Sequence, residues 1–213
     1  RRQRQVCIRD RSKTAFIFPG QGAQTAGMGK DFYENSEAAR SFFDNAQKIL
    51  DFDLKEMCFG EHEELNLTEY TQPCMVSVCL AIVQELKKRG ITPDITAGLS
   101  LGEYAAVAAA GGMNELDAIK LVRRRGILMQ STVPAGEGAM AAVLGLDAKK
   151  IEEILESFEN VWIANYNCPG QIVITGLTNE VQQASLALKE AGAKRVVELK
   201  VSGPFHSLLL KPA

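Results

Sequence analysis

The feature that most constrains this chain is a short apolar run that ends in Gly98-Leu99-Ser100-Leu101-Gly102 and leads into an apolar helical pattern. Ile95–Gly98 predicts a strand and residues 101–110 predict a helix, so the serine falls at a sharp strand-to-helix turn. Small residues around a serine permit such a turn, and free N–H groups at the helix start favour a developing oxyanion. Ser100 is therefore predicted to be a nucleophile, with a tight turn and an N-capping serine as the purely structural alternative.

The order of elements around this turn indicates an α/β fold. Thr14–Phe18 predicts a buried strand that Pro19-Gly20 ends. Helices are expected over residues 37–50, 73–89 and 115–129, with Pro73 in a first turn, Gly90 as a stop signal and Asn114 as an N-cap. Alternating strands and helices predict a parallel sheet in an α/β-hydrolase-like core that comprises residues 12–135 and 201–213.

The pattern changes between residues 136 and 200, where a β-α-β-β-α-β order predicts an inserted ferredoxin-like subdomain. The chain then returns to the core, and a core interrupted in this way is expected to continue, so its C-terminal part is expected to be missing. The predicted strands are Gly138–Leu144, Val161–Tyr166, Gln171–Gly176 and Arg195–Leu199, and the predicted helices are Ala148–Ser157 and Thr178–Gly192.

A serine nucleophile needs a general base, and the chain contains only two histidines. His62 lies in an acidic stretch typical of a solvated surface. His206 follows the serine in chain order and is the candidate base, with a core-packed histidine as the alternative. A Ser–His dyad is expected, because the acidic residues between the two fall inside the predicted subdomain, namely Asp147, Glu152 and Glu156.

Two further segments carry candidate binding groups. The Gly-rich loop at residues 20–24 is expected to supply a second oxyanion N–H, and it lacks the spacing of a phosphate-binding loop. Arg123, Arg124 and Arg125 stand about 100° apart on a helix, so they cannot share one face. One of them is expected to pair a substrate carboxylate, and at least two are expected to serve only as cations at a helix C-terminus.

Composition excludes several classes of protein. The five cysteines have no C-x-x-C spacing and an odd count, which disfavours disulfide frameworks and zinc sites and favours a reducing cytoplasm. Apolar runs are too short for a membrane span, and no secretory signal is visible. The first eleven residues hold five Arg and one Asp, a net +4, so the remainder sums to −6 within a total of −2. This segment is expected to be a non-native tag, with an arm for an anionic partner as the alternative.

Six segments together resemble the malonyl-CoA:acyl-carrier-protein transacylase family, which includes the acyltransferase domains of fatty acid and polyketide synthases. They occur in the family's order over residues 14–213. The segments are FPGQGAQ at Phe18–Gln24, TQP at Thr71–Pro73, GLSLGEY at Gly98–Tyr104, RRGILMQ at Arg124–Gln130, ANYNCPGQIVITG at Ala164–Gly176 and GPFHS at Gly203–Ser207.

The resemblance implies a role for each matching residue. Ser100 would attack a thioester and carry the acyl group, with His206 as general base. The backbone N–H of Leu101 and the Gln21 loop would form the oxyanion hole, and Arg125 would hold the free carboxylate of a malonyl group.

The resemblance also implies substrate contacts by Phe205, Gln72 and Asn165. Phe205 is typical of family members that select malonyl over methylmalonyl groups, since a bulky ring leaves less room for an α-methyl branch. Leu99 departs from the family, which usually has His before the nucleophile. A second departure is that the family continues well past GPFHS, with segments that include a backbone carbonyl for the histidine.

The implied reaction moves malonyl from coenzyme A to the phosphopantetheine thiol of an acyl carrier protein in a ping-pong sequence, for fatty acid or polyketide synthesis. No metal or redox cofactor, nucleic acid or membrane is implied, and a cytoplasmic monomer is expected. The carrier is expected to be acidic, so docking needs a basic patch around Arg123, Arg124, or Lys194 with Arg195. The alternatives are a serine esterase or thioesterase-type hydrolase, or an inactive fragment that acts only as a binding module.

Overall fold

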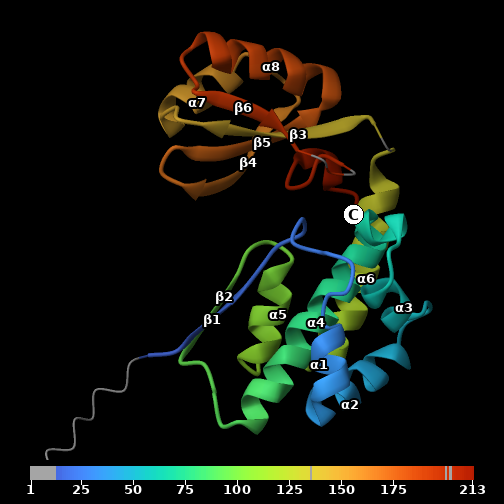
Figure 1. Ribbon diagram of the computed structural model, residues 1–213. Helices are drawn as coiled ribbons and strands as arrows, with labels where there is room; N and C mark the ends of the chain where they lie inside the picture. The colour runs from blue at the N-terminus through green and yellow to red at the C-terminus, as the bar shows by residue number, and fades with distance from the viewer. Residues whose placement is uncertain (1–12, 135, 200, 202) are drawn as a thin grey trace, which may run out of the picture.

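The computed structural model describes residues 13–134, 136–199, 201 and 203–213. It contains a two-stranded parallel sheet with helices on one side and a four-stranded antiparallel sheet at the opposite end of the molecule (Figure 1). The predicted basic tag at residues 1–11 lies outside the described residues. Among the helices that are described, none is both long and apolar enough to cross a membrane.

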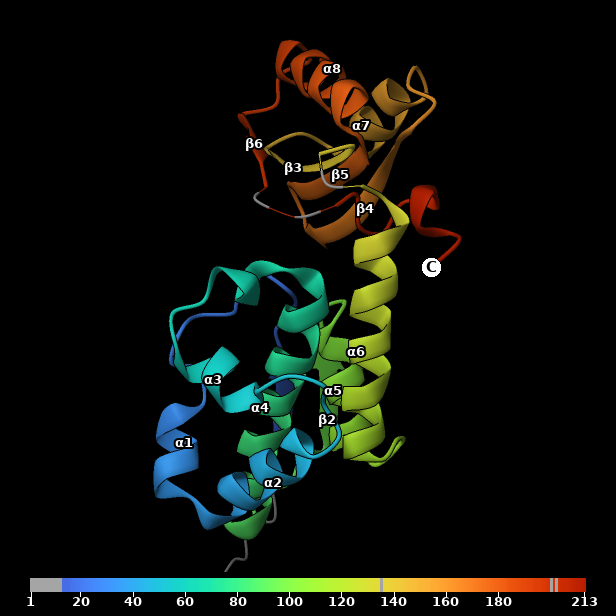
Figure 2. The same ribbon diagram turned by 90° about the vertical axis from the view of Figure 1, so that its right-hand side faces the viewer.

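The parallel sheet pairs strand β1 with strand β2, in register from Ala15 opposite Ile95 to Phe18 opposite Gly98. Helix α5 packs against this sheet, and helices α4 and α6 pack against α5 and against each other (Figure 2). Their shared core buries Phe43, Leu80 and Ile119 completely. The elements are β1 (Ala15–Phe18), α1 (Lys30–Asn35), α2 (Glu37–Gln47), α3 (Leu54–Phe59), the 3-10 helix η1 (Glu63–Asn66), α4 (Thr68–Lys88), β2 (Ile95–Gly98), α5 (Gly102–Ala109) and α6 (Glu115–Thr132).

Helix α4 begins five residues before Pro73, so the prediction that Pro73 stands in a first turn is wrong. Inside a helix, proline leaves the carbonyl four residues earlier without its N–H donor. Here that carbonyl belongs to Glu69, and the guanidinium Nη1 of Arg123 donates to it at 2.8 Å. A tertiary contact thus replaces the missing helical bond. Gly90, with φ 74°, follows the helix as predicted.

Helix α6 begins where the sequence predicts. The Asn114 side chain accepts hydrogen bonds from the N–H groups of Leu116 and Asp117 at 2.9 and 3.2 Å. Gly126 brings α6 against α4, because a Cβ at this position would lie 2.8 Å from the Cα of Glu69. The helix runs from the helical layer up to the second sheet (Figure 2).

The second sheet has the strand order β4-β5-β3-β6, and each neighbouring pair is antiparallel. Helices α7 and α8 pack on one face over Ile151, Ile174 and Leu188. This is the expected ferredoxin-like β-α-β-β-α-β unit, while its division from the core as a separate domain stays a prediction. Its elements are β3 (Gly138–Leu144), α7 (Ala148–Leu155), β4 (Val161–Cys168), β5 (Gln171–Leu177), α8 (Thr178–Glu190) and β6 (Arg195–Glu198), followed by the 3-10 helix η2 (Leu208–Leu210).

Candidate functional site

Ser100 sits on a sharp turn between β2 and α5, and its φ of 51° lies in the left-handed region. The two flanking glycines make this turn possible. A Cβ on Gly98 would lie 2.1 Å from the carbonyl carbon of Gly102, and a Cβ on Gly102 would lie 2.3 Å from the carbonyl oxygen of Phe18. Any side chain at either position would therefore force the backbones apart. The turn presents the serine hydroxyl at the start of α5, as a nucleophile elbow does.

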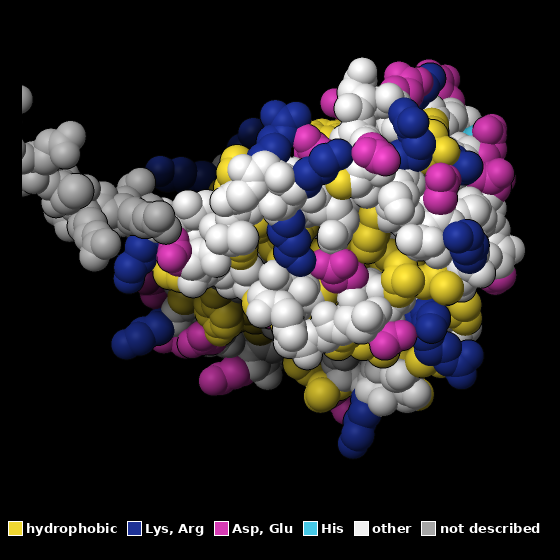
Figure 3. Space-filling model, turned by 90° about the horizontal axis from the view of Figure 1, so that it is seen from below, with side chains coloured by type: hydrophobic (Ala, Val, Ile, Leu, Met, Phe, Trp, Pro, Cys, Tyr) yellow, Lys and Arg dark blue, Asp and Glu magenta, His cyan; other side chains and the backbone are white. Residues whose placement is uncertain are grey.

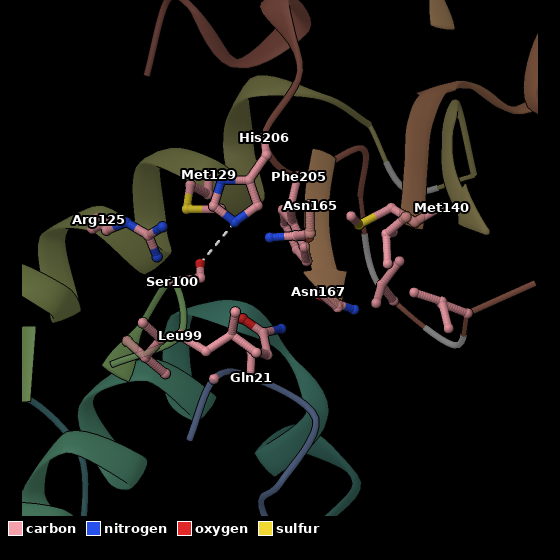
Figure 4. A pocket seen from close by; sticks show the side chains of 15 residues that line it. Gln21, Leu99, Ser100, Arg125, Met129, Met140, Asn165, Asn167, Phe205 and His206 are labelled. Carbon is pink, nitrogen blue, oxygen red and sulfur yellow. Dashed lines mark hydrogen bonds between the residues drawn. The ribbon is translucent and has the colours of Figure 1, made fainter. Parts of the chain in front are cut away.

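His206 faces Ser100 from the far end of the chain (Figure 4). Its Nε2 lies 2.8 Å from the Ser100 Oγ. Burial of part of the ring lowers the pKa of His206, and the nearby positive charge of Arg125 lowers it further, while Glu103 opposes the shift. The imidazole is therefore held neutral, and with its proton on Nδ1 it accepts the hydrogen bond from the serine hydroxyl.

Within the described chain, Ser100 is the hydrogen-bond partner of the His206 side chain, and no carboxylate joins them. Asp147 caps helix α7, and Glu152 accepts a hydrogen bond from the Tyr166 hydroxyl at 2.6 Å. The other histidine, His62, pairs with Glu56 at 3.1 Å on the surface of the helical layer. The residues that the structure describes thus form a dyad.

The three consecutive arginines have three different environments. Arg123 is held by Asp51 and Glu69 and is only 13% exposed, which removes it from the candidate docking cations. Arg124 is exposed. Arg125 turns toward Ser100 and His206 (Figure 4), where its Nη1 donates to the Gln72 Oε1 at 2.8 Å.

The two predicted oxyanion donors come together at the elbow. Gly20 lies against the elbow, since a Cβ there would be 2.8 Å from the Leu99 carbonyl oxygen. The Gln21 side chain points away and donates to the Thr68 Oγ1 at 3.0 Å. Among the described residues, neither the Gln21 nor the Leu101 backbone N–H has a hydrogen-bond acceptor. Both groups are available to a ligand oxygen.

These groups open on a cleft of about 200 Å³ between the elbow and the ferredoxin-like unit. Asn165 lines it, as the resemblance implied, whereas Gln72 does not, because it is fully buried behind Arg125. Sequence reasoning missed Asn167, which also lines the cleft, because the strand was predicted to end at Tyr166. It also missed the apolar lining, which nothing in the local sequence marks: Met129, Met140, Val173, Leu199 and Val201.

Residues 15–213 match the model of the acyl transferase domain. The chain belongs to this family. The described part of this acyl transferase domain holds no cluster of three or more His, Cys, Asp or Glu side chains that could bind a metal ion.

Two relatives by sequence are named malonyl CoA-acyl carrier protein transacylase. The Bacillus subtilis protein is 51% identical over 207 residues, which cover 95% of this chain and 65% of the relative. A Staphylococcus aureus protein is 47% identical over 205 residues, which cover 94% of this chain and 66% of the relative. The chain therefore spans about two thirds of the length of these curated relatives.

Solved structures share the fold. A Clostridium perfringens malonyl CoA-acyl carrier protein transacylase superposes with a TM-score of 0.89 at 43% identity, and the match covers 94% of this chain and 65% of that one. A second structure contains a type II PKS acyl-carrier protein in complex with its malonyl-transacylase. It superposes with a TM-score of 0.90 at 41% identity and covers 94% and 67% of the two chains.

In this acyl transferase domain, Phe205 forms an apolar wall of the cleft that Ser100 also lines. It is buried against Met140, Ala142 and Val173 of the ferredoxin-like sheet. Leu99, in the place where the family usually has His, is half exposed and also lines the cleft. The cleft therefore combines an apolar wall with one cation, Arg125, and three amide side chains, those of Gln21, Asn165 and Asn167.

Proposed function

We propose that this domain transfers a malonyl group from coenzyme A to the phosphopantetheine thiol of an acyl carrier protein. The observation that carries the proposal is the 2.8 Å contact between Ser100 and His206 in the same cleft as Arg125. The dyad accounts for acyl transfer, and the arginine accounts for an acyl group with a free carboxylate.

In the first half-reaction, the Ser100 Oγ attacks the thioester carbonyl while the His206 Nε2 takes the hydroxyl proton. The N–H groups of Leu101 and Gln21 stabilise the negative charge on the carbonyl oxygen. The C–S bond then breaks, and the sulfur of coenzyme A leaves with the proton that His206 returns. Malonyl remains as an ester on Ser100.

The second half-reaction runs the same steps in reverse with a different thiol. His206 takes the proton of the phosphopantetheine thiol, and the sulfur attacks the malonyl ester. Ser100 leaves and recovers its proton from His206. Since both halves exchange an acyl group between nucleophiles, the reaction that we propose needs no metal and no redox cofactor.

Arg125 and Phe205 account for the choice of acyl group in this proposal. The Arg125 guanidinium lies over the Tyr104 ring, 5.4 Å from its centroid, and bonds Gln72 through one nitrogen. The remaining donors can bind a carboxylate in a fork. The buried Phe205 ring limits the space beside the α-carbon. A plain esterase for neutral acyl groups would leave this cation without a partner.

The carrier protein is proposed as the acceptor because a structural relative at 41% identity was solved in complex with such a protein. With Arg123 occupied by Asp51 and Glu69, Arg124 and the pair Lys194 and Arg195 are the remaining candidates for its docking. A role in fatty acid or polyketide synthesis, a cytoplasmic location and a monomeric state remain predictions.

The test is the intact mass of the protein after brief incubation with malonyl-CoA, beside the Ser100→Ala variant. A malonyl adduct on the wild type that is absent from the variant is expected. Release of the adduct on addition of holo carrier protein, faster than in buffer, distinguishes a transferase from a hydrolase. A folded wild type that gains no adduct contradicts the proposal for this chain.

A further inference from the structure

Arg123 makes more contacts than either neighbouring arginine, yet it has no part in the proposed chemistry. Its Nε and Nη2 donate to the two carboxylate oxygens of Asp51, each at 2.9 Å. Its Nη1 donates to the Glu69 carbonyl oxygen at 2.8 Å and to the Glu69 Oε2 at 3.1 Å. Four of the five N–H donors of the guanidinium are therefore used, in a planar arrangement that a lysine could not reproduce.

Two aromatic rings fix the plane of this guanidinium. Its central carbon lies 5.2 Å from the Phe52 ring centroid and 5.0 Å from the Tyr70 ring centroid. The two rings pack edge to face, 5.1 Å apart. The guanidinium thus lies beside both rings, and a cation within about 6 Å of a ring centroid is attracted to it, most strongly where water is excluded. Each of the three guanidinium nitrogens of Arg123 donates to a protein oxygen, and the side chain is only 13% exposed.

The bond to Glu69 ties Arg123 to the start of helix α4. Pro73 frees the Glu69 carbonyl, and a buried carbonyl without a donor is costly. Arg123 supplies that donor from α6, next to the close approach of Gly126 to the Glu69 backbone. Helices α4 and α6 are thereby joined at one defined point.

The functional groups stand directly beside this point. Gln72 lies one turn after Glu69 on α4, and Arg125 lies two residues after Arg123 on α6. The 2.8 Å hydrogen bond between Arg125 and Gln72 therefore requires that α4 and α6 do not slide past one another. Thr68, one residue before Glu69, also accepts the bond from Gln21 of the oxyanion loop.

We propose that Arg123 is a positioning residue that locks α6 to the first turns of α4 and so holds Arg125 against Gln72, in the orientation that receives the substrate carboxylate. This inference rests on the proposed function. If Arg123 has this role, its loss lowers the rate of acylation by a charged acyl group more than the rate of acylation by an uncharged one.

The test compares Arg123→Met with Lys120→Met, which removes an exposed cation from the same helix. The rate of acylation of Ser100 is measured with malonyl-CoA and with acetyl-CoA, whose acyl group has no carboxylate. For Arg123→Met, the ratio of the two rates is expected to fall about tenfold, equivalent to ~1.4 kcal/mol. In Arg123→Lys the ratio of the two rates should fall less, and in Lys120→Met it should keep the wild-type value.

An equal loss of both rates in Arg123→Met would show a merely structural role and would overturn the inference. Should this variant fail to fold, Asp51→Asn provides the same comparison, because it weakens only one partner of Arg123. A smaller fall in the ratio is then expected, and an unchanged ratio contradicts the proposal.

A second readout separates this inference from the proposed function. Failure of the wild type to gain a malonyl adduct would contradict the function alone. The crystal structure of Arg123→Met then decides the positioning role, through the distance between the Arg125 Nη1 and the Gln72 Oε1. Loss of the 2.8 Å bond supports it, and a retained bond overturns it.

Discussion

At the scale of single residues, the site depends on two side chains held in an uncommon backbone conformation. Ser100 and His206 have φ values of 51° and 60°, and in the described chain no other residue except glycine has a positive φ. This conformation costs of order 1–3 kcal/mol for such residues and persists only where surrounding contacts impose it. In these conformations the Ser100 hydroxyl and the His206 imidazole lie at hydrogen-bond distance, 2.8 Å apart.

The pH dependence of acylation should report the lowered pKa of His206. Because the base must be neutral, the rate falls as the pH drops through that pKa, so the midpoint is expected below the ordinary value for histidine. Glu103→Gln removes a negative charge that stabilises the imidazolium, which should move the midpoint lower still. The measurement is the rate of the malonyl adduct against pH. Glu56→Gln, beside His62, is the control and should not move the midpoint.

At the scale of elements, the nucleophile elbow depends on contacts between backbones. Gly98 and Gly102 stand where β2, α5 and the end of β1 meet, with no room for a Cβ at either position. Helix α6 depends instead on a side chain at its start, where Asn114 satisfies two N–H groups. Substitutions at these two places are therefore expected to lower the free energy of unfolding by different amounts.

Gly102→Ala is expected to lower the free energy of unfolding by about 3 kcal/mol, because its methyl group would collide with the Phe18 carbonyl oxygen. Urea denaturation measures this change. Gly112→Ala is the matched control, since the nearest atom to its Cβ is a Val107 methyl carbon at 3.2 Å, which can move. Equal effects of the two substitutions would contradict the contact assigned to Gly102.

Asn114→Ala should lower the free energy of unfolding by about 1 kcal/mol, because two N–H groups of α6 lose their acceptor. The same denaturation experiment measures it. Ser131→Ala near the other end of the helix is the control, with an expected change within about 0.5 kcal/mol, as for an exposed position. A negligible effect of Asn114→Ala would mean that water replaces the cap.

At the scale of the whole molecule, the surface mixes charged and apolar side chains. On the face seen in Figure 3, acidic and basic side chains are interspersed and apolar side chains reach the surface between them. Two exposed apolar side chains belong to the parallel sheet, namely Ile17 and Ile95, which are 78% and 55% exposed. Exposed apolar strands tend to pair with other chains.

The predicted monomer is therefore expected only in dilute solution, and the chain is expected to self-associate as its concentration rises. Ile17→Lys should reduce the association. Light scattering over a concentration series measures the mean mass. Leu186→Lys on helix α8 is the control, because that leucine is 60% exposed but lies on a helix rather than a strand. An equal effect of both substitutions would assign the association to general hydrophobicity.

Local patterns in the sequence predicted most elements of the fold. Strand Ile95–Gly98 and strand Gly138–Leu144 have the predicted bounds, because turn residues mark the ends of both apolar runs. The prediction that Thr14–Phe18 is buried is wrong, because Ile17 on β1 is 78% exposed. Helices α1 and α3 were not predicted, since six residues are too few to show a helical period. The start of α4 was misplaced because the donor that tolerates Pro73 comes from another helix.

The sequence by itself determined the turn at Ser100, the pairing of Ser100 with His206 and the type of both sheets, because glycine spacing, residue chemistry and periodicity are local properties. Only the tertiary structure decided which of three adjacent arginines faces the cleft, that Gln72 supports Arg125 from behind, and which apolar residues line the wall. Those outcomes depend on contacts between segments far apart in the chain, such as Arg123 with Asp51 and Glu69. Helix geometry separates the three side chains, but only packing assigns each a partner.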